Sequence, residues 1–339
     1  MKEEIARPRK GRRPGAIVSA LRPWFRANGR DLPWRRTRDP YAVLVSEFML
    51  QQTTVVAVVP YFERWMAAFP TVKALAEADE QSVLGLWQGL GYYSRARNLH
   101  RAAKAMMERH GGEVPDDPAQ LEALPGIGAY TAAAVMAFAF DKPAAVVDAN
   151  VARVLARLHD FREPVDSARG KKFLREAALA LQPEAGAGEF NSALMELGAL
   201  MCKPRAPLCP ECPIRGACRA REPESLPMKR PRQAVTAVTE RRAWIVENGA
   251  VHLALSTGRW KGMWILPEVE DAAAPVAHVE NYPITRYRVR MEVVAAPPAR
   301  IPGLRAFRLD EIDEVPIPSP HRRAIAALAK KLPNRQVAS

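Results

Sequence analysis

An acidic residue and two amides lie close together in the stretch SEFMLQQT, from Ser46 to Thr53. The apolar residues around them recur at the spacing of one buried helix face, which places Glu47 at the edge of that face and Gln51 one turn later. A carboxyl group beside an apolar core is a candidate proton donor, because an apolar environment disfavours its charged form. Taken alone, the same pattern is also typical of a solvated polar edge of a helix. Other polar residues must decide between these interpretations.

A second carboxylate, Asp148, precedes the helix that is predicted from the apolar stripe of VVDANVARVLARL. An aspartate at this position can serve as an N-cap and needs no further role. A cap that faces a cleft can nevertheless offer its carboxylate to a ligand. Asp148 is therefore a candidate for both functions.

Two glycines stand before a predicted helix in LPGIGAYTA, from Leu124 to Ala132. Gly126 and Gly128 would let the backbone come close to a ligand, and the amides that open the next helix can hold a phosphate. A tight turn between two helices explains the same residues. The stretch LGYYSRARNLH, from Leu90 to His100, adds two tyrosines and two arginines, which suit either nucleic-acid contact or packing beside a solvated face.

The cysteines of the chain all fall in one loop, as Cys202, Cys209, Cys212 and Cys218, in the pattern C-x6-C-x2-C-x5-C. In a reducing cytoplasm, four clustered thiols are typical of ligands, and they suit either a tetrahedral zinc ion or an iron-sulfur cube. Zinc sites usually contain two close pairs of ligands. Here only Cys209 and Cys212 form such a pair, so the spacing favours the cluster while leaving zinc open.

The composition is that of a globular protein with a basic surface. The chain has 339 residues, 48% of them hydrophobic, and its 50 basic and 37 acidic residues give a net charge of +13. Such an excess suits a polyanionic partner. No apolar run reaches the length of a membrane span, and no apolar segment follows the charged N-terminus. We therefore expect a cytoplasmic protein that has no contact with a membrane.

The elements that must position these residues change in character along the chain. From Pro14 to about Leu200 the apolar residues follow a helical period, and short turns are marked by Gly or Pro. Residues 221–239 are rich in proline and basic residues, which indicates a linker. Beyond them, alternating segments such as YRVRMEVV and an amphipathic closing helix from Pro320 to Leu332 predict a small α+β domain.

These motifs together resemble the MutY family of adenine-specific mismatch DNA glycosylases, within the endonuclease III superfamily. The similarity covers, in order along most of residues 20–220, LPWRR, SEFMLQQT, PYFERW, GLGYYSRARNLH, LPGIGAYTA, VVDANV, FNSALMELGALMC and the cysteine loop. It implies a multi-domain protein with an all-α glycosylase domain (residues 1–220), a helix-hairpin-helix near residues 118–138, and a 4Fe-4S cluster in the loop 202–218. It also implies a bacterial, nucleoid-associated monomer that binds duplex DNA with adenine opposite 8-oxoguanine or guanine.

The resemblance also assigns the chemistry. Removal of adenine breaks a bond from a sugar carbon to a ring nitrogen, and Glu47 matches the acid that protonates the leaving base. Asp148 would stabilise the developing sugar cation, and Tyr130 would support Asp148 and the sugar. The endonuclease III branch has a lysine in place of Tyr130 that cuts the strand through a Schiff base. We therefore expect a glycosylase that uses water and leaves the strand intact.

Further residues are implied to bind the DNA around the flipped nucleotide. Gln52 resembles the family's wedge into the gap in the base stack, Tyr92 would assist it, and Gln51 would contact the DNA nearby. Gly126 and Gly128 belong to the hairpin that approaches the backbone. The pocket for the flipped adenine would be lined by Arg30, Trp34 and Arg35.

Residues 240–339 resemble, more weakly, the Nudix-like domain of the same family. The matching stretch is GRWKGMWILPEVE, Gly258 to Glu270, and the acidic motif of a working Nudix hydrolase is missing. The domain should therefore recognise 8-oxoguanine rather than hydrolyse a substrate. The family reads the lesion through Phe-Ser-His, where this chain has Ile284, Thr285 and Arg286. Thr285 keeps the hydroxyl acceptor, whereas a guanidinium can only donate.

Two other functions are compatible with the sequence. A sister glycosylase of the same superfamily, for example one acting on thymine opposite guanine, would share Tyr130. A non-catalytic protein could retain the cluster and the hairpin to bind damaged DNA. The Nudix-like residues argue against the first alternative, and the presence of both Glu47 and Asp148 argues against the second.

Overall fold

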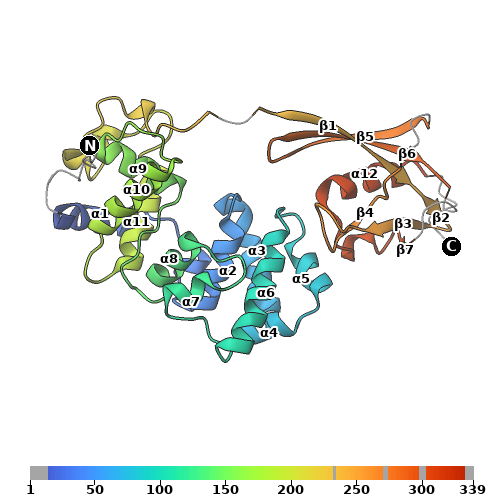
Figure 1. The fold of residues 1–339 in the computed structure, drawn as a ribbon, viewed down its shortest axis with the longest axis horizontal. Coiled ribbons are helices and arrows are strands. Elements are labelled where there is room, and N and C mark those ends of the chain that lie inside the picture. The colour runs from blue at the N-terminus through green and yellow to red at the C-terminus, as the bar shows by residue number, and fades with distance from the viewer. Residues whose placement is uncertain (1–13, 232–233, 270–273, 298–302, 333–339) are drawn as a thin grey trace, which may run out of the picture. The chain divides into compact units, whose positions relative to one another are not determined.

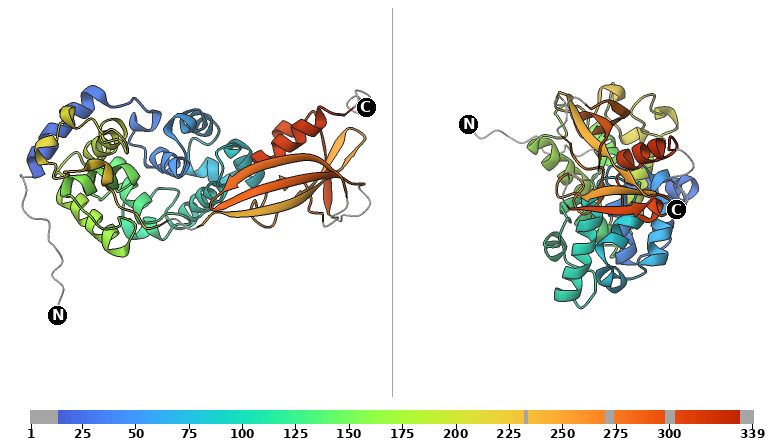
Figure 2. Two further views of the ribbon diagram at one scale, coloured as in Figure 1. Left: turned by 90° about the horizontal axis from the view of Figure 1, so that it is seen from above. Right: turned by 90° about the vertical axis from the view of Figure 1, so that its right-hand side faces the viewer.

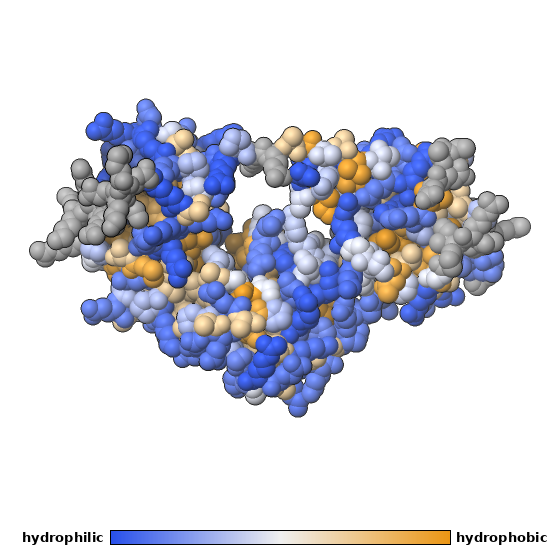
Figure 3. Space-filling model, in the orientation of Figure 1, coloured by the Kyte–Doolittle hydropathy of each residue, from blue (hydrophilic) through white to orange (hydrophobic). Residues whose placement is uncertain are grey.

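The computed structural model describes residues 14–231, 234–269, 274–297 and 303–332. Contacts divide the chain into two units, each of which combines separate stretches of sequence. The first contains the described residues of 1–73 together with 101–231, and the second contains 74–100 together with the described residues of 232–339. Among the described residues, no helix is long and apolar enough to cross a membrane. Hydrophilic residues cover most of the face seen in Figure 3.

The first unit is helical (Figure 1). Two helices, α4 (Val72–Glu77) and α6 (Ser94–Arg109), cross the division between the units. The elements that lie within the first unit are α1 (Pro14–Asn28), η1 (Pro33–Arg35), α2 (Pro40–Leu50), α3 (Val55–Ala68), α7 (Pro118–Glu122), α8 (Ala129–Phe138), α9 (Ala149–His159), α10 (Ala168–Ala180), α11 (Ala187–Leu200), η2 (Cys209–Glu211), η3 (Arg215–Ala217) and η4 (Pro223–Ser225).

The helix α2 is buried on all sides. Asp39 caps it by accepting a hydrogen bond from the Tyr41 amide at 3.0 Å, and Pro40 suits its first turn. Every residue from Tyr41 to Met49 is buried, because α3, α8 and η1 pack around the helix. The expectation of one buried face, with Glu47 at its edge, was therefore wrong: Glu47 lies inside the protein.

A separate core joins the first helix of the chain to later ones. Buried residues of α1, α9, α10 and α11 form one apolar cluster, and Cys202 and Cys212 pack against it. The amphipathic stripe of α9 supplies Val151, Val154 and Leu155. The loop of four cysteines thus rests on a packed helical core.

The helices α7 and α8 form the predicted hairpin. Asp117 caps α7 by accepting from the Gln120 amide at 2.9 Å. Gly126 has φ +78°, a conformation that favours glycine, whereas Gly128 has φ −104° and precedes α8. A side chain at Gly128 would meet no atom within 4 Å, so the backbone there is open to a ligand.

The second unit combines the helix α5 (Glu80–Trp87) with strands from the C-terminal part of the chain. Its first sheet has the order β1-β6-β5, with β1 (Thr236–Trp244) parallel to β6 (Tyr287–Ala295), and β5 (Val276–Ile284) antiparallel to β6. The strand β3 (Ala250–Leu255) pairs with β2 (Val246–Glu247), β4 (Trp264–Ile265) and β7 (Leu304–Arg308) in the second sheet. Figure 2 shows the long strands of the first sheet side by side.

The expected closing helix is α12 (Ser319–Ala329), which packs on β5 and follows η6 (Ile312–Glu314). The strands and this helix confirm that the chain has a C-terminal region of mixed character in addition to its helical core. Of the stretch GRWKGMWILPEVE, all but Glu270 belongs to the described residues.

Candidate active site

The first unit contains a cavity of about 860 Å³ that is lined by residues far apart in the sequence. Both candidate catalytic carboxylates face it, together with Tyr130. The other predicted site residues that line it are Arg30, Trp34, Arg35, Gln51 and Gln52.

Glu47 projects from the buried helix α2 and is only 4% exposed. The Tyr130 hydroxyl of α8 lies within hydrogen-bonding reach of its carboxyl group. Burial raises the pKa of Glu47 to about 7, the nearby charge of Asp148 adds to the rise, and Tyr130 opposes it. Near neutral pH a large fraction of Glu47 is therefore protonated, as a general acid requires.

Asp148 caps α9 and faces the cavity at the same time. Its Oδ1 accepts a hydrogen bond from the Val151 amide at 2.7 Å, and its Oδ2 accepts one from the Asn150 side chain at 3.1 Å. Burial raises the pKa of Asp148, while these hydrogen bonds work against the rise. Arg153 donates to Asn150 Oδ1 at 2.9 Å and so fixes the amide that holds Asp148. The cap of α9 is thus also part of the cavity wall, so the structure is compatible with both functions expected of Asp148.

A buried carboxylate that the sequence analysis did not single out joins two predicted pocket residues. Glu196 of α11 accepts from Arg30 Nε at 2.5 Å and from Arg35 Nη2 at 2.8 Å, and its side chain is fully buried. Arg35 also donates to the Arg30 carbonyl at 3.0 Å. Burial works to raise the pKa of Glu196, but the two guanidinium groups lower it overall. Trp34 packs edge-on against Phe62 at 5.4 Å between ring centroids.

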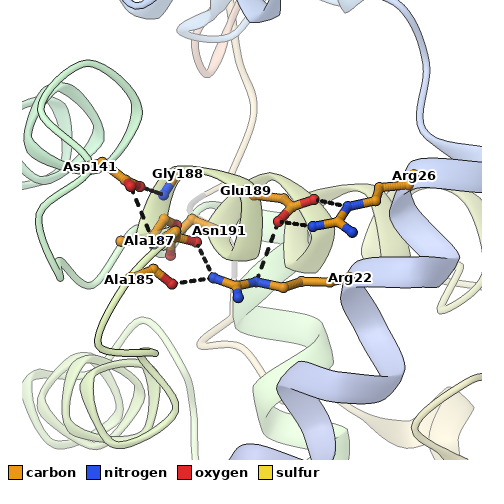
Figure 4. Close-up of polar contacts among 9 residues, drawn as sticks. Arg22, Arg26, Asp141, Ala185, Ala187, Gly188, Glu189 and Asn191 are labelled. Atoms are coloured by element: carbon orange, nitrogen blue, oxygen red, sulfur yellow. Dashed lines mark hydrogen bonds and ion pairs between the residues drawn. The ribbon is translucent and has the colours of Figure 1, made fainter.

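The beginning of α11 is tied to two other elements at the rim of the cavity (Figure 4). Asp141, from the loop after α8, accepts hydrogen bonds from the amides of Gly186 and Gly188 at 3.2 and 2.9 Å. Arg22 and Arg26 of α1 both pair with Glu189, at 3.4 and 2.6 Å. These contacts fix the rotation of α11 about its axis.

The remaining predicted DNA contacts lie on turns. Gln52 has φ +57°, an unusual conformation for a residue other than glycine. Gly126 and Gly128 lie in the α7–α8 turn and do not line the cavity. Tyr92 and Thr285 belong to the second unit, where both have positive φ, and Tyr92 is 42% exposed.

Two arginines of α9 contact the cysteine loop, mainly at Cys202. The buried Arg157 donates to the Cys202 sulfur at 3.3 Å and to the carbonyls of Lys203 and Pro204 at 2.7 and 3.1 Å. Arg153 donates to the Cys202 carbonyl at 2.7 Å. Burial raises the pKa of Cys212, and the other three thiols add to the rise. Among the described residues, however, no group of three or more His, Cys, Asp or Glu side chains is placed to hold a metal ion.

Glu196, Arg153 and Arg157 were not predicted from the sequence. A signal was present for each. Glu196 is an acidic residue within the apolar stretch FNSALMELGALMC, the same kind of exception that drew attention to Glu47. Arg153 and Arg157 are one turn apart beside the apolar stripe of α9, where a charged residue needs a partner.

Comparison with known proteins finds relatives in both sequence and structure. Residues 45–176 match the family model of the HhH-GPD superfamily base excision DNA repair proteins. The chain is 45% identical to the adenine DNA glycosylase of Rattus norvegicus over 208 residues, which are 59% of this chain and 40% of that protein. It is 31% identical to the adenine DNA glycosylase of Buchnera aphidicola subsp. Acyrthosiphon pisum over 260 residues, 73% of each chain.

Among solved structures, a thermostable thymine-DNA glycosylase is similar with a TM-score of 0.55 and 32% identity. The match covers 62% of this chain and 96% of that one. The mammalian relatives are longer, and this chain matches about two fifths of their length.

Proposed function

This chain belongs to the adenine DNA glycosylase family, and on that premise we propose that it releases adenine mispaired with 8-oxoguanine or guanine in duplex DNA. The observation that carries the proposal is the pair of carboxyl groups on one cavity, the buried Glu47 and the half-buried Asp148. Their environments differ, since only Asp148 accepts hydrogen bonds from a helix terminus. A proton donor and a negative charge are the two groups that this reaction needs.

In the proposed mechanism, protonated Glu47 gives its proton to a ring nitrogen of the flipped adenine as the bond to the sugar breaks. The bonding electrons leave with the base, so positive charge develops on the sugar. Asp148 stabilises that charge, and its cap hydrogen bonds hold its oxygens in place. Water then adds to the sugar carbon and gives one proton to the Glu47 carboxylate, which restores the acid. Tyr130, within reach of Glu47, orients the acid.

The test is base release from duplexes that contain each mismatch, with the DNA strands examined before and after treatment with alkali. We expect release of adenine opposite 8-oxoguanine and guanine, with strands that break only after alkali. The likeness to a thymine-DNA glycosylase favours thymine opposite guanine as the second candidate substrate. Release of thymine but not adenine would support that candidate instead.

We also propose that Cys202, Cys209, Cys212 and Cys218 bind a 4Fe-4S cluster. The sulfur of Cys202 accepts a hydrogen bond from Arg157, and the sulfur of Cys218 donates one to the Arg157 carbonyl. The Arg157 guanidinium can offset the negative charge of four thiolates. The cluster would fix the loop, including Lys203 and Arg205, against DNA phosphates. Purified protein should therefore be brown, with close to four iron and four sulfide ions per chain.

This prediction is checked by iron and sulfide analysis of protein prepared without oxygen. Cys209→Ser should lower thermal stability and DNA affinity more than it lowers the rate of base release from bound DNA. Stoichiometric zinc without visible absorbance would contradict the proposal.

We further propose that residues 1–220 form the glycosylase domain, 221–239 a linker, and 240–339 a Nudix-like domain that recognises the lesion. Thr285 and Arg286 form the two-residue turn between β5 and β6, and Thr285 adopts φ +49°. A β-branched residue in this conformation is strained, and such strain is commonly found at functional sites. Both residues are exposed, and the Arg286 guanidinium lies 5.1 Å from the Tyr287 ring.

If this turn reads the lesion, the preference for 8-oxoguanine over guanine depends on the Thr285 hydroxyl. Oxidation converts nitrogen seven of guanine from a hydrogen-bond acceptor into a donor. A hydroxyl oxygen can accept the hydrogen bond that this nitrogen donates. Thr285→Ala should narrow the preference by about five- to tenfold, because one hydrogen bond contributes about 1 kcal/mol. Thr285→Ser is the matched control and should retain it. Arg286→His should widen the preference and reduce the salt dependence of binding.

The measurement is single-turnover release from both mismatches at two salt concentrations. An unchanged preference in Thr285→Ala, together with no effect of Arg286→His, would place the lesion reader elsewhere.

A further inference from the structure

We infer that Glu196 is a positioning residue that ties the guanidinium groups of Arg30 and Arg35 to the cavity wall and keeps them away from Glu47. The inference rests on the proposed function, in which Glu47 must hold a proton. Glu196 contacts both cations directly, with three hydrogen bonds of 2.5 to 3.2 Å from their side chains. The Arg30 amide adds a fourth contact at 3.3 Å.

The helix α11 places this carboxylate where it is needed. Glu189, Ser192 and Glu196 follow at positions i, i+3 and i+7, and all three line the cavity. Figure 4 shows the contacts of Asp141, Arg22 and Arg26 that hold the first turn of this helix. Two turns further on, the same helix face delivers Glu196 to Arg30 and Arg35 from inside the protein.

The charges around Glu47 explain why such a tie matters. The titratable groups that line the cavity with it are Arg30, Arg35, Arg38, Tyr130, Asp141, Asp148, Glu189 and Glu196. The neighbours that act on the pKa of Glu47 are Tyr130 and Asp148, neither of which is a cation. A positive charge within about 4–6 Å of a carboxyl group typically lowers its pKa by about 1–3 units. An arginine that turned toward Glu47 would therefore deprotonate the acid.

Glutamine at position 196 keeps the size of the side chain and removes the charge that holds the cations. Glu196→Gln should move the alkaline limb of the pH–rate profile down by at least one pH unit. Release of adenine at pH 8 should then fall about tenfold below wild type, with less than a threefold loss at pH 5.5. A purely structural role would lower the rate by the same factor at every pH.

A second measurement needs no substrate. The melting temperatures of proteins with and without Glu47→Gln are compared from pH 4.5 to 9, in the wild-type and the Glu196→Gln backgrounds. The gain in melting temperature caused by Glu47→Gln should grow with pH. It should level off near pH 7 in the wild-type background and at least one pH unit lower in the Glu196→Gln background. This readout reports the proton affinity of Glu47 even if the DNA substrate has been misidentified, so the two proposals fail separately.

Removing one of the cations provides the control. The pH of the alkaline limb should rise in the order Glu196→Gln, then the double variant Arg35→Met with Glu196→Gln, then Arg35→Met alone. If Glu196→Gln alone does not fold, the double variant can be compared with Arg35→Met. Both lack Arg35, but Glu196 still holds Arg30 in Arg35→Met and no longer does so in the double variant. The inference would be overturned if the alkaline limb of the pH–rate profile lay at the same pH in all these variants, and the melting-temperature difference levelled off at the same pH with and without Glu196→Gln.

Discussion

Glu47→Gln is expected to lower the single-turnover rate of adenine release by about a hundredfold to ten-thousandfold, the usual contribution of general acid catalysis. Glutamine fills the same buried space next to α2, and its side-chain carbonyl can still accept a hydrogen bond from Tyr130. It has no proton to give to the leaving base. Binding of mismatched duplex should therefore remain within a few-fold of wild type. Near wild-type release by this variant would remove Glu47 from the mechanism.

The pH dependence of the same reaction follows from the protonation of Glu47. Because burial raises its pKa to about 7, the protonated fraction falls as pH rises through this value. The wild-type rate should thus decrease about tenfold per pH unit above about pH 7. The residual rate of Glu47→Gln should lack this limb.

The free energy of unfolding provides the control for folding of this variant. Glu47→Gln is expected to lower the rate but to raise the stability at alkaline pH. A carboxyl group with a raised folded pKa stabilises the folded state less as pH rises from its ordinary value toward the folded one. The shift from 4.5 to about 7 corresponds to about 3 kcal/mol. Glu47→Gln should therefore be more stable than wild type at pH 8 and close to it near pH 4.5. Equal stability at both pH values would indicate that Glu47 is not buried as a neutral acid.

The extent to which this site could be predicted depended on whether the signal was local. Asp148 stands directly before an apolar stripe, so its role as a cap was evident from neighbouring residues, and the cap geometry confirms it. Glu47 was expected at the edge of a buried helix face, with the other side of the helix exposed, whereas the structure buries Glu47 and every residue from Tyr41 to Met49. Local periodicity cannot reveal that α3, α8 and η1 cover α2 from different directions, since those contacts come from elsewhere in the chain.

Glu196 shows the same limit more strongly. Its partners Arg30 and Arg35 lie more than 160 residues earlier in the chain, and no spacing relates them. The sequence contains an acidic residue in an apolar helix and two arginines near a tryptophan, which are separate and common features. Only the packing of α11 against α1 and the following turn brings them onto one wall. Charge pairs of this kind become visible when the fold is known.

Asp148→Asn is expected to separate the structural role of this residue from its chemical one. Asparagine is as good an N-cap as aspartate, so it can still accept from the Val151 amide. Its amide group would face the Asn150 amide in place of a carboxylate oxygen, so a destabilisation of about 1 kcal/mol is expected from the lost hydrogen bond. The negative charge near the sugar is gone, and the rate of adenine release should fall by about a hundredfold to a thousandfold.

The measurement for Asp148→Asn is single-turnover release at saturating enzyme, together with denaturant unfolding of the free protein. Asp148→Ala should lose the cap as well, with a further destabilisation of up to about 2 kcal/mol. The matched control is Asp79→Asn, which changes the same side chain at the cap of α5, where Asp79 accepts from the Ser82 amide at 3.0 Å. This control should release adenine at the wild-type rate, because Asp79 does not line the cavity. If Asp148→Asn also released adenine at that rate, the sugar cation would have to be stabilised by another group, and Asp148 would be a helix cap alone.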